Sequence, residues 1–383
     1  MGIPLLLEKA SNYGSIKIKY ISNLILHLKL ENHINIVGAG PAGLTAAIVL
    51  AKHGYKPTVY EMSPDVGHRM SGDFQGLENW SGDKDIVALL RELGIAANFL
   101  CIPYYEGDIC APKIASLKIK SERPVFYLVK RGGANDSLDN GLKEQAVYLG
   151  VEMVFNRRIE SFEGKTIIAM GPKRADFIAA GITFDTETEN MAAVIFNDEI
   201  APKGYAYLLI NNGFGTMATV IYKDFKNTKK YFKNLVNFFR NEKYTDIKNE
   251  KRFGGFGNFF IRNTNAFDKK IYVGESAGFQ DYLWGFGLRY AIMSGYLAAM
   301  SIITGSDYDS LWKKEVKPML ETSLVNRYLI EKFGDFGYRY IARKFAEGSP
   351  CNFLKRNYNP SFFKKILLPI AKNKYKKNEF LEI

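Results

Sequence analysis

The stretch that decides the fold is His33–Glu61, HINIVGAGPAGLTAAIVLAKHGYKPTVYE. It opens with a short apolar run, Asn35–Val37, which predicts a β-strand. Pro57–Tyr60 is a second extended run, and Gly54 before it is a natural helix stop. Between the two runs, apolar residues recur at helical spacing, at Leu44, Ala47, Ile48 and Ala51. The order of strand, glycine turn, helix and strand predicts the first βαβ unit of a Rossmann-like α/β fold.

The turn of this unit carries the pattern Gly-x-Gly-x-x-Gly. Gly38 allows the tight turn, Gly40 the close approach of backbone to a pyrophosphate, and Gly43 the close packing of helix on strand. Glu61, eighteen residues after Gly43, suits ribose hydroxyls. The alternative is a glycine-rich turn without a ligand. We expect a dinucleotide to contact Gly38, Gly40, Pro41, Ala42, Gly43, Glu61 and Met62.

Composition excludes several other classes of protein. The 383 residues, 47% of them hydrophobic, are enough for a large core. Three cysteines without a Cys-x-x-Cys pair and four histidines without ligand spacing favour neither a disulfide framework nor a metal site. Because residues 1–30 lack a secretory signal pattern and the chain has no long apolar run, we expect a cytoplasmic protein.

The net charge of +12 is concentrated near the C-terminus. It forms no groove-reading helix or aromatic-basic motif, so we expect no nucleic-acid partner. The segment 359–377, NPSFFKKILLPIAKNKYKK, mixes large apolar residues with lysines, which suits an anionic membrane surface at the inner face. A solvated, partly frayed tail is the alternative. Pro369 is expected to interrupt any long helix in this tail.

Patterns along the rest of the chain predict an interleaved organisation. Helices are expected at Lys84–Leu93, Ser137–Leu149 and Thr228–Arg240, and strands at Val151–Phe155, Thr166–Met170, Ala192–Phe196, Ala206–Ile210, Met217–Tyr222 and Lys269–Val273. The glycine-rich stretch 254–260, GGFGNFF, is expected to be a loop. These patterns divide the chain into an extension (1–30), a nucleotide-binding part (31–180) with an insertion (62–125), a β-rich substrate domain (181–252), a second nucleotide-binding part (253–306) and a helical region with a basic tail (307–383).

A second glycine motif lies at 270–299, KIYVGESAGFQDYLWGFGLRYAIMSGYLAA. It repeats the order of strand, turn with an acid, and glycines that open a long helix. Here the chain resembles the geranylgeranyl reductases within the para-hydroxybenzoate hydroxylase superfamily of flavoproteins. The resemblance implies that FAD is bound, with its ribityl chain at Gly274, Glu275 and Gly278 and its flavin edge at Gly285 and Gly287.

Other segments resemble the same family. Arg131, ahead of the helix at Ser137, matches an arginine that lies near the FAD pyrophosphate, and Arg69 matches a glycine-arginine element that begins at Gly67. APKGYAYLL, 201–209, resembles the substrate wall of the reductases. The chain departs from the family where Glu275 replaces the usual Asp, Tyr282 a common proline and Met170 the Asp of an Asp-Gly pair. These departures affect the reaction more than the cofactor.

Tyrosines are the candidate substrate-side residues. Tyr205 and Tyr207 alternate on an expected strand and would share a face, where they could close an apolar tunnel or donate a proton. Tyr282 lies in the turn before the flavin-edge helix and is the third candidate catalytic residue. Ordinary sheet packing or a packed loop is the alternative for each. Flavin-mediated reduction needs no catalytic triad, because the cofactor carries the chemistry.

The sequence therefore favours an FAD-dependent oxidoreductase that reduces carbon–carbon double bonds of an isoprenoid or other hydrophobic, lipid-like substrate. No second complete βαβ fingerprint is present, so NAD(P)H or another reduced carrier is expected to visit the flavin transiently. Two alternatives stay open. One is a flavin-dependent monooxygenase of an aromatic substrate, and the other is a non-catalytic, membrane-associated protein that FAD stabilises.

Overall fold

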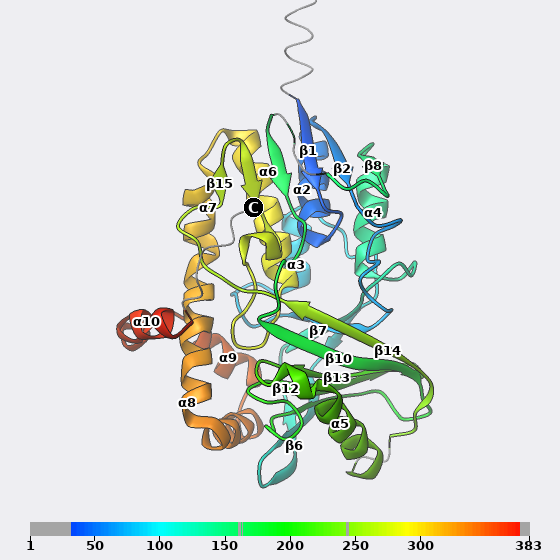
Figure 1. Cartoon of the computed structure of the whole chain (residues 1–383), viewed down its shortest axis with the longest axis vertical. Helices are drawn as coiled ribbons and strands as arrows, with labels where there is room; N and C mark the ends of the chain where they lie inside the picture. The colour runs from blue at the N-terminus through cyan, green and yellow to red at the C-terminus, as the bar shows by residue number, and fades with distance from the viewer. Residues whose placement is uncertain (1–31, 160–161, 163, 243–244, 376–383) are drawn as a thin grey trace, which may run out of the picture.

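The computed structural model describes residues 32–159, 162, 164–242 and 245–375 (Figure 1). The expected extension at 1–30 and the last residues of the basic tail, 376–383, lie outside these ranges. Three sheets and a set of C-terminal helices make up the described part. This is the mixed α/β architecture that the sequence predicts, with a Rossmann-type domain and a helical C-terminal region.

The nucleotide-binding sheet has six strands in the order β15-β16-β9-β1-β2-β8. Its strands are β1 (His33–Val37), β2 (Lys56–Tyr60), β8 (Glu152–Val154), β9 (Thr166–Ile168), β15 (Ala266–Phe267) and β16 (Lys270–Tyr272). β1 runs parallel to β2 on one side and to β9 on the other, and β16 runs parallel to β9. The βαβ prediction is thus confirmed, and the chain returns to this sheet after a long excursion.

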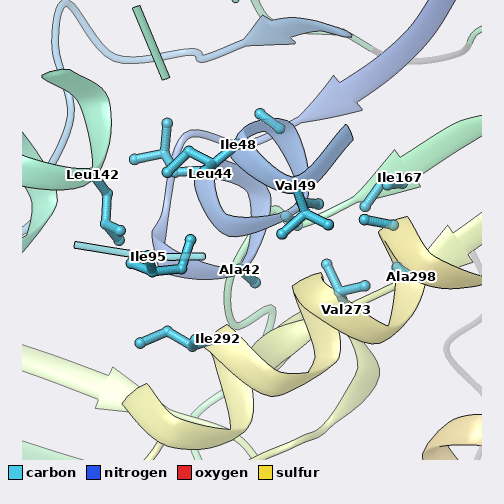
Figure 2. Close-up of a cluster of buried hydrophobic side chains, with 14 of the residues drawn as sticks. Ala42, Leu44, Ile48, Val49, Ile95, Leu142, Ile167, Val273, Ile292 and Ala298 are labelled. Carbon is cyan, nitrogen blue, oxygen red and sulfur yellow. The ribbon is translucent and has the colours of Figure 1, made fainter. Parts of the chain in front are cut away.

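Helices cover this sheet and form its core. They include α2 (Pro41–Lys52), α4 (Leu138–Tyr148) and α6 (Leu288–Thr304). α2 and α6 approach so closely that a Cβ on Gly295 would lie 2.2 Å from the carbonyl oxygen of Ala42. Figure 2 shows the apolar side chains that fill the space beside them, among them Leu44, Ile48, Ile167, Ile292 and Ala298. Small residues on α6 therefore allow the contact that brings the two glycine motifs together.

The second sheet has seven strands in the order β14-β10-β13-β12-β11-β5-β6. They are β5 (Glu106–Ala111), β6 (Ile114–Lys120), β10 (Phe177–Asp185), β11 (Met191–Ile195), β12 (Tyr205–Asn211), β13 (Phe214–Ile221) and β14 (Lys248–Gly257). η1 (Phe225–Asn227) leads into α5 (Thr228–Glu242), which packs on β10 and β13. The sheet overruns the expected domain 181–252 at both ends and also recruits β5 and β6 from the expected insertion 62–125.

The prediction of a loop at 254–260 is wrong for its first half. Residues 254–257 belong to β14, which pairs antiparallel with β10. Glycine is used there for packing, because a Cβ on Gly257 would lie 2.3 Å from Cζ of Phe177. At this position the neighbouring strand supplies the large ring of Phe177, which fills the space that a side chain would take.

A third sheet connects the other two. It contains β3 (Phe74–Glu78), β4 (Cys101–Tyr104) and β7 (Phe126–Lys130) in the order β3-β7-β4. α3 (Ile86–Glu92) lies between β3 and β4 in the chain and begins after Asp85, whose carboxylate accepts hydrogen bonds from the backbone N–H groups of Val87 and Ala88. The insertion 62–125 is thus divided between two sheets and is no separate unit.

Four helices close the described chain: α7 (Tyr308–Glu315), α8 (Lys317–Glu347), α9 (Pro350–Tyr358) and α10 (Phe362–Tyr375). α8 bends at Gly334, where φ is 49°. α10 lies at one edge of the molecule against α8 (Figure 1). The expected interruption at Pro369 is wrong, since α10 continues through it. Pro369 and Lys365 are both exposed, so water can reach the carbonyl that the proline leaves unpaired. Within the described residues, no helix is long and apolar enough to cross a membrane.

Candidate cofactor-binding site

The first glycine loop combines two crowded glycines with an open one. A Cβ on Gly38 would lie 2.3 Å from the carbonyl oxygen of Ala169, and one on Gly43 would lie 2.1 Å from that of Gly38. Gly40, by contrast, has no atom within 4 Å of its Cβ position. It is the N-cap of α2 and provides no side-chain cap, and Pro41 and Ala42 begin the helix. The loop therefore presents free backbone and the positive end of a helix to an anion.

Glu61 lies beside this loop at the end of β2. Its Oε2 accepts a hydrogen bond of 2.9 Å from the backbone N–H of Ala39, and its Oε1 accepts one of 2.9 Å from that of Ser63. These contacts hold the carboxylate next to the glycine turn, where it can also accept hydrogen bonds from ribose hydroxyls. Met62 follows with 67% of its surface exposed, at the open side of the same turn.

The second glycine motif contacts the first. Its turn, η2 (Gly274–Ala277), follows β16, and a Cβ on Gly274 would lie 3.0 Å from Cβ of Ala42 in the first turn of α2. The N–H of Gly274 donates to Oγ of Ser294 on α6 at 2.9 Å. Gly278 has φ of 77° and ends the turn in contact with Phe260. Two motifs that are far apart in the sequence thus build one site.

An acid and two arginines line the space between the motifs. Oε2 of Glu275 lies 3.9 Å from Nη2 of Arg69. Arg131 is buried and donates from Nε and Nη2 to Asp139 at 2.9 and 3.0 Å, and from Nη1 to Gln75 at 3.1 Å. Burial raises the pKa of Glu275 to about 7, although Arg69 and Arg131 act in the opposite direction. Glu275 can therefore donate or accept a hydrogen bond near neutral pH.

In the structure, Arg131 forms an ion pair with Asp139 on α4. The sequence did not predict this partner, although Asp139 is only eight residues away, because the expected role was contact with a phosphate. The buried pair orients the start of α4 against β7 and positions Gln75 beside the site. Arg69 is half exposed and is thus the more accessible of the two arginines.

The start of α6 forms the other end of the site. Gly287 is its N-cap and provides no side-chain hydrogen bond to the free N–H groups. Gly285, with φ of 72°, would place a Cβ 3.1 Å from the hydroxyl of Tyr222 and 3.2 Å from Cζ of Phe177. A second free helix N-terminus, suited to negative charge, thus lies against aromatic side chains.

These rings belong to an aromatic cluster, which we define as the buried Phe177, Phe259 and Tyr282 and the partly buried Tyr205, Tyr207 and Tyr222. The rings of Tyr205 and Tyr207 are 6.3 Å apart on one face of β12, and those of Phe259 and Tyr282 are 4.2 Å apart. The hydroxyl of Tyr205 donates to the carbonyl of Trp284 at 2.7 Å. The structure therefore brings all three candidate tyrosines together beside Gly285.

Burial raises the pKa of Tyr205, Tyr207 and Tyr282 above the ordinary value of 10. Each phenol stays protonated at physiological pH and can act as a hydrogen-bond or proton donor. The sequence did not single out Phe177, Tyr222 or Phe259 as members of the cluster. The first two lie on or next to strands whose pairing could not be foreseen, and Phe259 lies just after a strand expected to be a loop.

These features fit a flavin dinucleotide at both of its ends. The open Gly40, the uncapped α2 and the nearby Glu61 suit a pyrophosphate and a ribose. Glu275 and the uncapped α6 suit polar groups that a ribityl chain and a flavin ring carry. In the described part of the chain, no group of three or more His, Cys, Asp or Glu side chains is arranged to hold a metal ion.

The fold and the site define a class, the proteins with a Rossmann-type FAD/NAD(P)-binding domain. A family model described as an NAD(P)-binding Rossmann-like domain matches residues 36–76. The thiamine thiazole synthase of Pyrococcus horikoshii is 32% identical to this chain over 113 residues, which cover 29% of this chain and 44% of that protein. The match thus covers less than half the length of this curated relative.

Solved structures extend the likeness to most of the chain. A geranylgeranyl bacteriochlorophyll reductase-like protein from Thermoplasma acidophilum superposes with a TM-score of 0.68 at 17% identity, over 90% of this chain and 98% of that one. A flavin-dependent brominase superposes with a TM-score of 0.61 at 17% identity, over 90% and 99% of the two chains. At such low identity these likenesses show a shared fold.

Proposed function

We propose that this protein is an FAD-dependent oxidoreductase that reduces carbon–carbon double bonds of an isoprenoid or similarly hydrophobic substrate. One observation carries the proposal. The glycine motifs at 38–43 and 274–287 meet at one site, and the free N-terminus of α6 adjoins the aromatic cluster. A dinucleotide site that ends at an apolar, aromatic surface suits an apolar substrate.

FAD, when bound, supplies hydride transfer to the double bond. The residues of this chain hold it and prepare its surroundings. The N-terminus of α2 neutralises the pyrophosphate, Glu61 accepts from the ribose, and Glu275 exchanges hydrogen bonds with a hydroxyl. The N–H groups at the start of α6 favour negative charge at the flavin edge, which stabilises the reduced state.

The aromatic cluster excludes water and provides the apolar contact surface. Tyr205, Tyr207 and Tyr282 carry protons that their buried positions retain. A phenol beside the reacting carbon can donate the proton that completes saturation of the double bond. Reduced nicotinamide or another soluble carrier is proposed as the transient electron source.

An anaerobic single-turnover experiment tests the proposal. The protein is loaded with FAD, reduced with dithionite and mixed with polyprenyl lipids, and flavin absorbance and product mass are followed together. Reoxidation coupled to a gain of two hydrogen atoms per product molecule is expected. Turnover only on admission of oxygen, with a gain of one oxygen atom, would replace the proposal by a monooxygenase. Flavin that stays reduced with every lipid and with oxygen would indicate a non-catalytic, FAD-stabilised protein.

We further propose that α10 binds an anionic lipid surface at the cytoplasmic face of a membrane. Four large apolar side chains on one side of this helix are exposed: Phe362 (80%), Phe363 (60%), Ile366 (56%) and Ile370 (50%). Between residues 350 and 375 the chain carries six Lys or Arg residues and no Asp or Glu. An exposed apolar stripe within a purely basic segment complements anionic headgroups over an apolar layer.

The opposite side of α10 faces the site. Leu367, Leu368 and Ala371 pack in the same hydrophobic cluster as Phe259 and Tyr282. Lys372 and Lys374 bind Glu321 and Glu331 of α8 at 2.7 and 2.6 Å, which holds the helix in place. A lipid surface on the outer side of α10 would therefore lie one helix away from the aromatic cluster, a short path for a lipid substrate.

A further inference from the structure

A set of ionisable side chains is buried behind the start of α6, outside the residues that the proposed function uses. It consists of Glu78 on β3, Asp281 in the glycine turn, Arg289 and Tyr290 on α6, and Tyr358 on α9. We name this set the acid cluster. Each of its members is at least nine-tenths buried, and Glu78 is only 1% exposed.

Two acids in this cluster differ in how they are satisfied. Asp281 accepts a 2.6 Å hydrogen bond from the hydroxyl of Tyr358 and one of 2.6 Å from the N–H of Trp284. Among the described residues, neither carboxylate oxygen of Glu78 makes a well-formed hydrogen bond, although the backbone N–H groups of Glu78 and Arg289 lie near enough to favour its charged form. Nη1 of Arg289 and the hydroxyl of Tyr290 also lack partners there. A structural role is sufficient for Asp281 but leaves Glu78 and Arg289 unexplained, because unpaired buried polar groups are costly.

Gly82 lies beside the guanidinium of Arg289. A Cβ on Gly82 would lie 2.2 Å from Nη2 of Arg289, so a larger residue there would displace the end of this side chain. Arg289 is the second residue of α6, directly after the uncapped N-terminus at Gly287. Its positive charge therefore adds to that of the helix end.

The charges in the cluster are coupled. Burial raises the pKa of Glu78 to about 8, opposed by the charge of Arg289 and by the N–H groups of Glu78 and Arg289 and reinforced by Asp281. Burial also raises the pKa of Asp281 to about 6. It lowers the pKa of Arg289, and Glu78, Tyr290 and Asp85 act in the opposite direction. Near neutral pH Glu78 is mainly uncharged, so Arg289 then lacks the counter-charge of Glu78.

We propose that Glu78 and Arg289 form a proton switch linked to the redox state of a cofactor at the start of α6. Uptake of a proton by Glu78 unmasks the charge of Arg289 and stabilises the reduced, more negative cofactor. Loss of that proton pairs the two charges and favours the oxidised cofactor. The inference rests on the FAD site of the proposed function.

The balance of charge follows from linkage. Two electrons and one proton reach FAD from reduced nicotinamide or dithionite in water, which adds one negative charge beside α6. That charge raises the affinity of Glu78 for a proton, so one further proton passes from solvent to its carboxylate. Reoxidation of the cofactor returns it. Glu78 acts on the cofactor through the charge of Arg289. Both Glu78 and Arg289 are therefore positioning residues.

The pH dependence of the flavin midpoint potential, measured by spectroelectrochemistry, tests this. Each extra proton taken up with two electrons steepens the slope by about 30 mV per pH unit. In the wild-type protein we expect such a steeper region to begin near about pH 8. Glu78→Gln should match the wild type below about pH 7 and show a higher potential above about pH 8, because a neutral side chain always leaves Arg289 unmasked. If the midpoint potentials of Glu78→Gln and of the wild type follow parallel curves at all pH values, the proposed switch is wrong.

Controls separate this inference from others. Glu106→Gln, an exposed change on β5, should follow the wild-type curve, and Arg289→Gln should lower the potential most strongly below about pH 8. Glu275 titrates in every variant, so the difference between Glu78→Gln and wild type isolates Glu78. If Glu78→Gln does not fold, the wild-type protein alone still tests the inference. A wild-type plot of midpoint potential against pH that lacks the steeper region contradicts it.

A measurement on the cofactor-free protein provides an independent readout. Infrared difference spectra across the titration should show the carbonyl stretch of a protonated carboxylic acid that disappears as pH rises through about 8. Glu78→Gln should lack this component, while the bands of Glu275 and Asp281, which titrate at lower pH, remain. Absence of this band from the wild type would overturn the inference even if FAD binds. Protein that shows the band but takes up no FAD would instead overturn the proposed function, and the redox linkage with it.

Discussion

Individual glycines in the first motif have separable roles. Gly38 and Gly43 are required by contacts inside the folded chain, since a Cβ on either would overlap a backbone carbonyl. Gly40 meets no such obstacle, because its Cβ position is empty within 4 Å and its φ of −81° is open to any residue. Its glycine is therefore explained by a ligand that approaches the loop.

This difference predicts opposite outcomes for two substitutions. Gly40→Val should fold with a near-native free energy of unfolding and lose FAD affinity by at least about tenfold, or about 1.4 kcal/mol. Gly43→Val should lose about 3 kcal/mol of stability or more, because its side chain cannot fit against Gly38. Urea denaturation of the apo-proteins and FAD titration by fluorescence check both. A Gly40→Val protein that retains FAD with native affinity would contradict the assignment of the loop.

Glu78 also predicts a pH dependence of stability. Its pKa in the folded protein, about 8, lies above the ordinary value of 4.5, so the folded state holds this proton more tightly than the unfolded chain. The contribution is complete below about pH 4.5 and is lost as pH rises towards about 8. Relative to the wild type, Glu78→Gln should gain stability over this window and level off above it. Urea midpoints at several pH values measure this, and a constant difference would argue against a buried proton.

At the scale of elements, periodicity placed the helices and strands that it assigned close to their observed positions, although it left several strands, among them β3 to β7 and β10, unassigned. The strand at Thr166, the helix after Ser137 and the helix from Thr228 all form within a few residues of their expected bounds. The two errors have tertiary causes. In β14, Gly257 leaves room for the ring of Phe177 on β10. α10 continues through Pro369 because the affected turn faces solvent. Local propensity cannot predict either the packing of β14 on β10 or the solvent exposure of the turn at Pro369.

The outer face of α10 yields a prediction for this helix as a unit. The triple change Phe362→Ser, Ile366→Ser and Ile370→Ser should lower affinity for phosphatidylglycerol vesicles by at least about tenfold, since each apolar side chain buried in lipid contributes about 1.5–3 kcal/mol. Added salt should weaken wild-type binding as well. Sedimentation with vesicles is the measurement, and FAD content should not change.

Val147→Ser with Tyr148→Ser, on exposed positions of α4, is the matched control for that experiment and should bind as the wild type does. Phosphatidylcholine vesicles should bind weakly in every case. If the triple variant sediments with vesicles as the wild type does, the membrane proposal is wrong. If α10 retains a protein partner but binds no vesicles, its outer face binds a protein and not a lipid surface.

At the scale of the whole molecule, the cofactor site links distant parts of the chain. β1 and α2 provide one motif, β16 and α6 the other, and the β-rich sheet lies between them in sequence. A ligand that contacts both motifs should stabilise the entire fold, because binding to the native state alone shifts the unfolding equilibrium.

FAD at about 100 times its Kd should therefore add about 2.7 kcal/mol to the free energy of unfolding and raise Tm in a single transition. Differential scanning calorimetry with and without FAD measures this, and the control Gly40→Val should gain at most about 1.4 kcal/mol at the same FAD concentration. A transition that splits, so that only part of the molecule responds, would contradict a site built from both motifs.

The sequence by itself determined the Rossmann-type unit, the pairing of two glycine motifs with acids, and the basic, apolar C-terminal segment. Those features are local, because turn geometry, helix periodicity and charge are set by neighbouring residues. Only the tertiary structure decided that Arg131 pairs with Asp139, that six aromatic side chains gather beside Gly285, and that Glu78 is buried behind α6. These depend on strand order and on helix contacts between segments far apart in the chain, and desolvation, which governs their pKa values, exists only once the chain has packed.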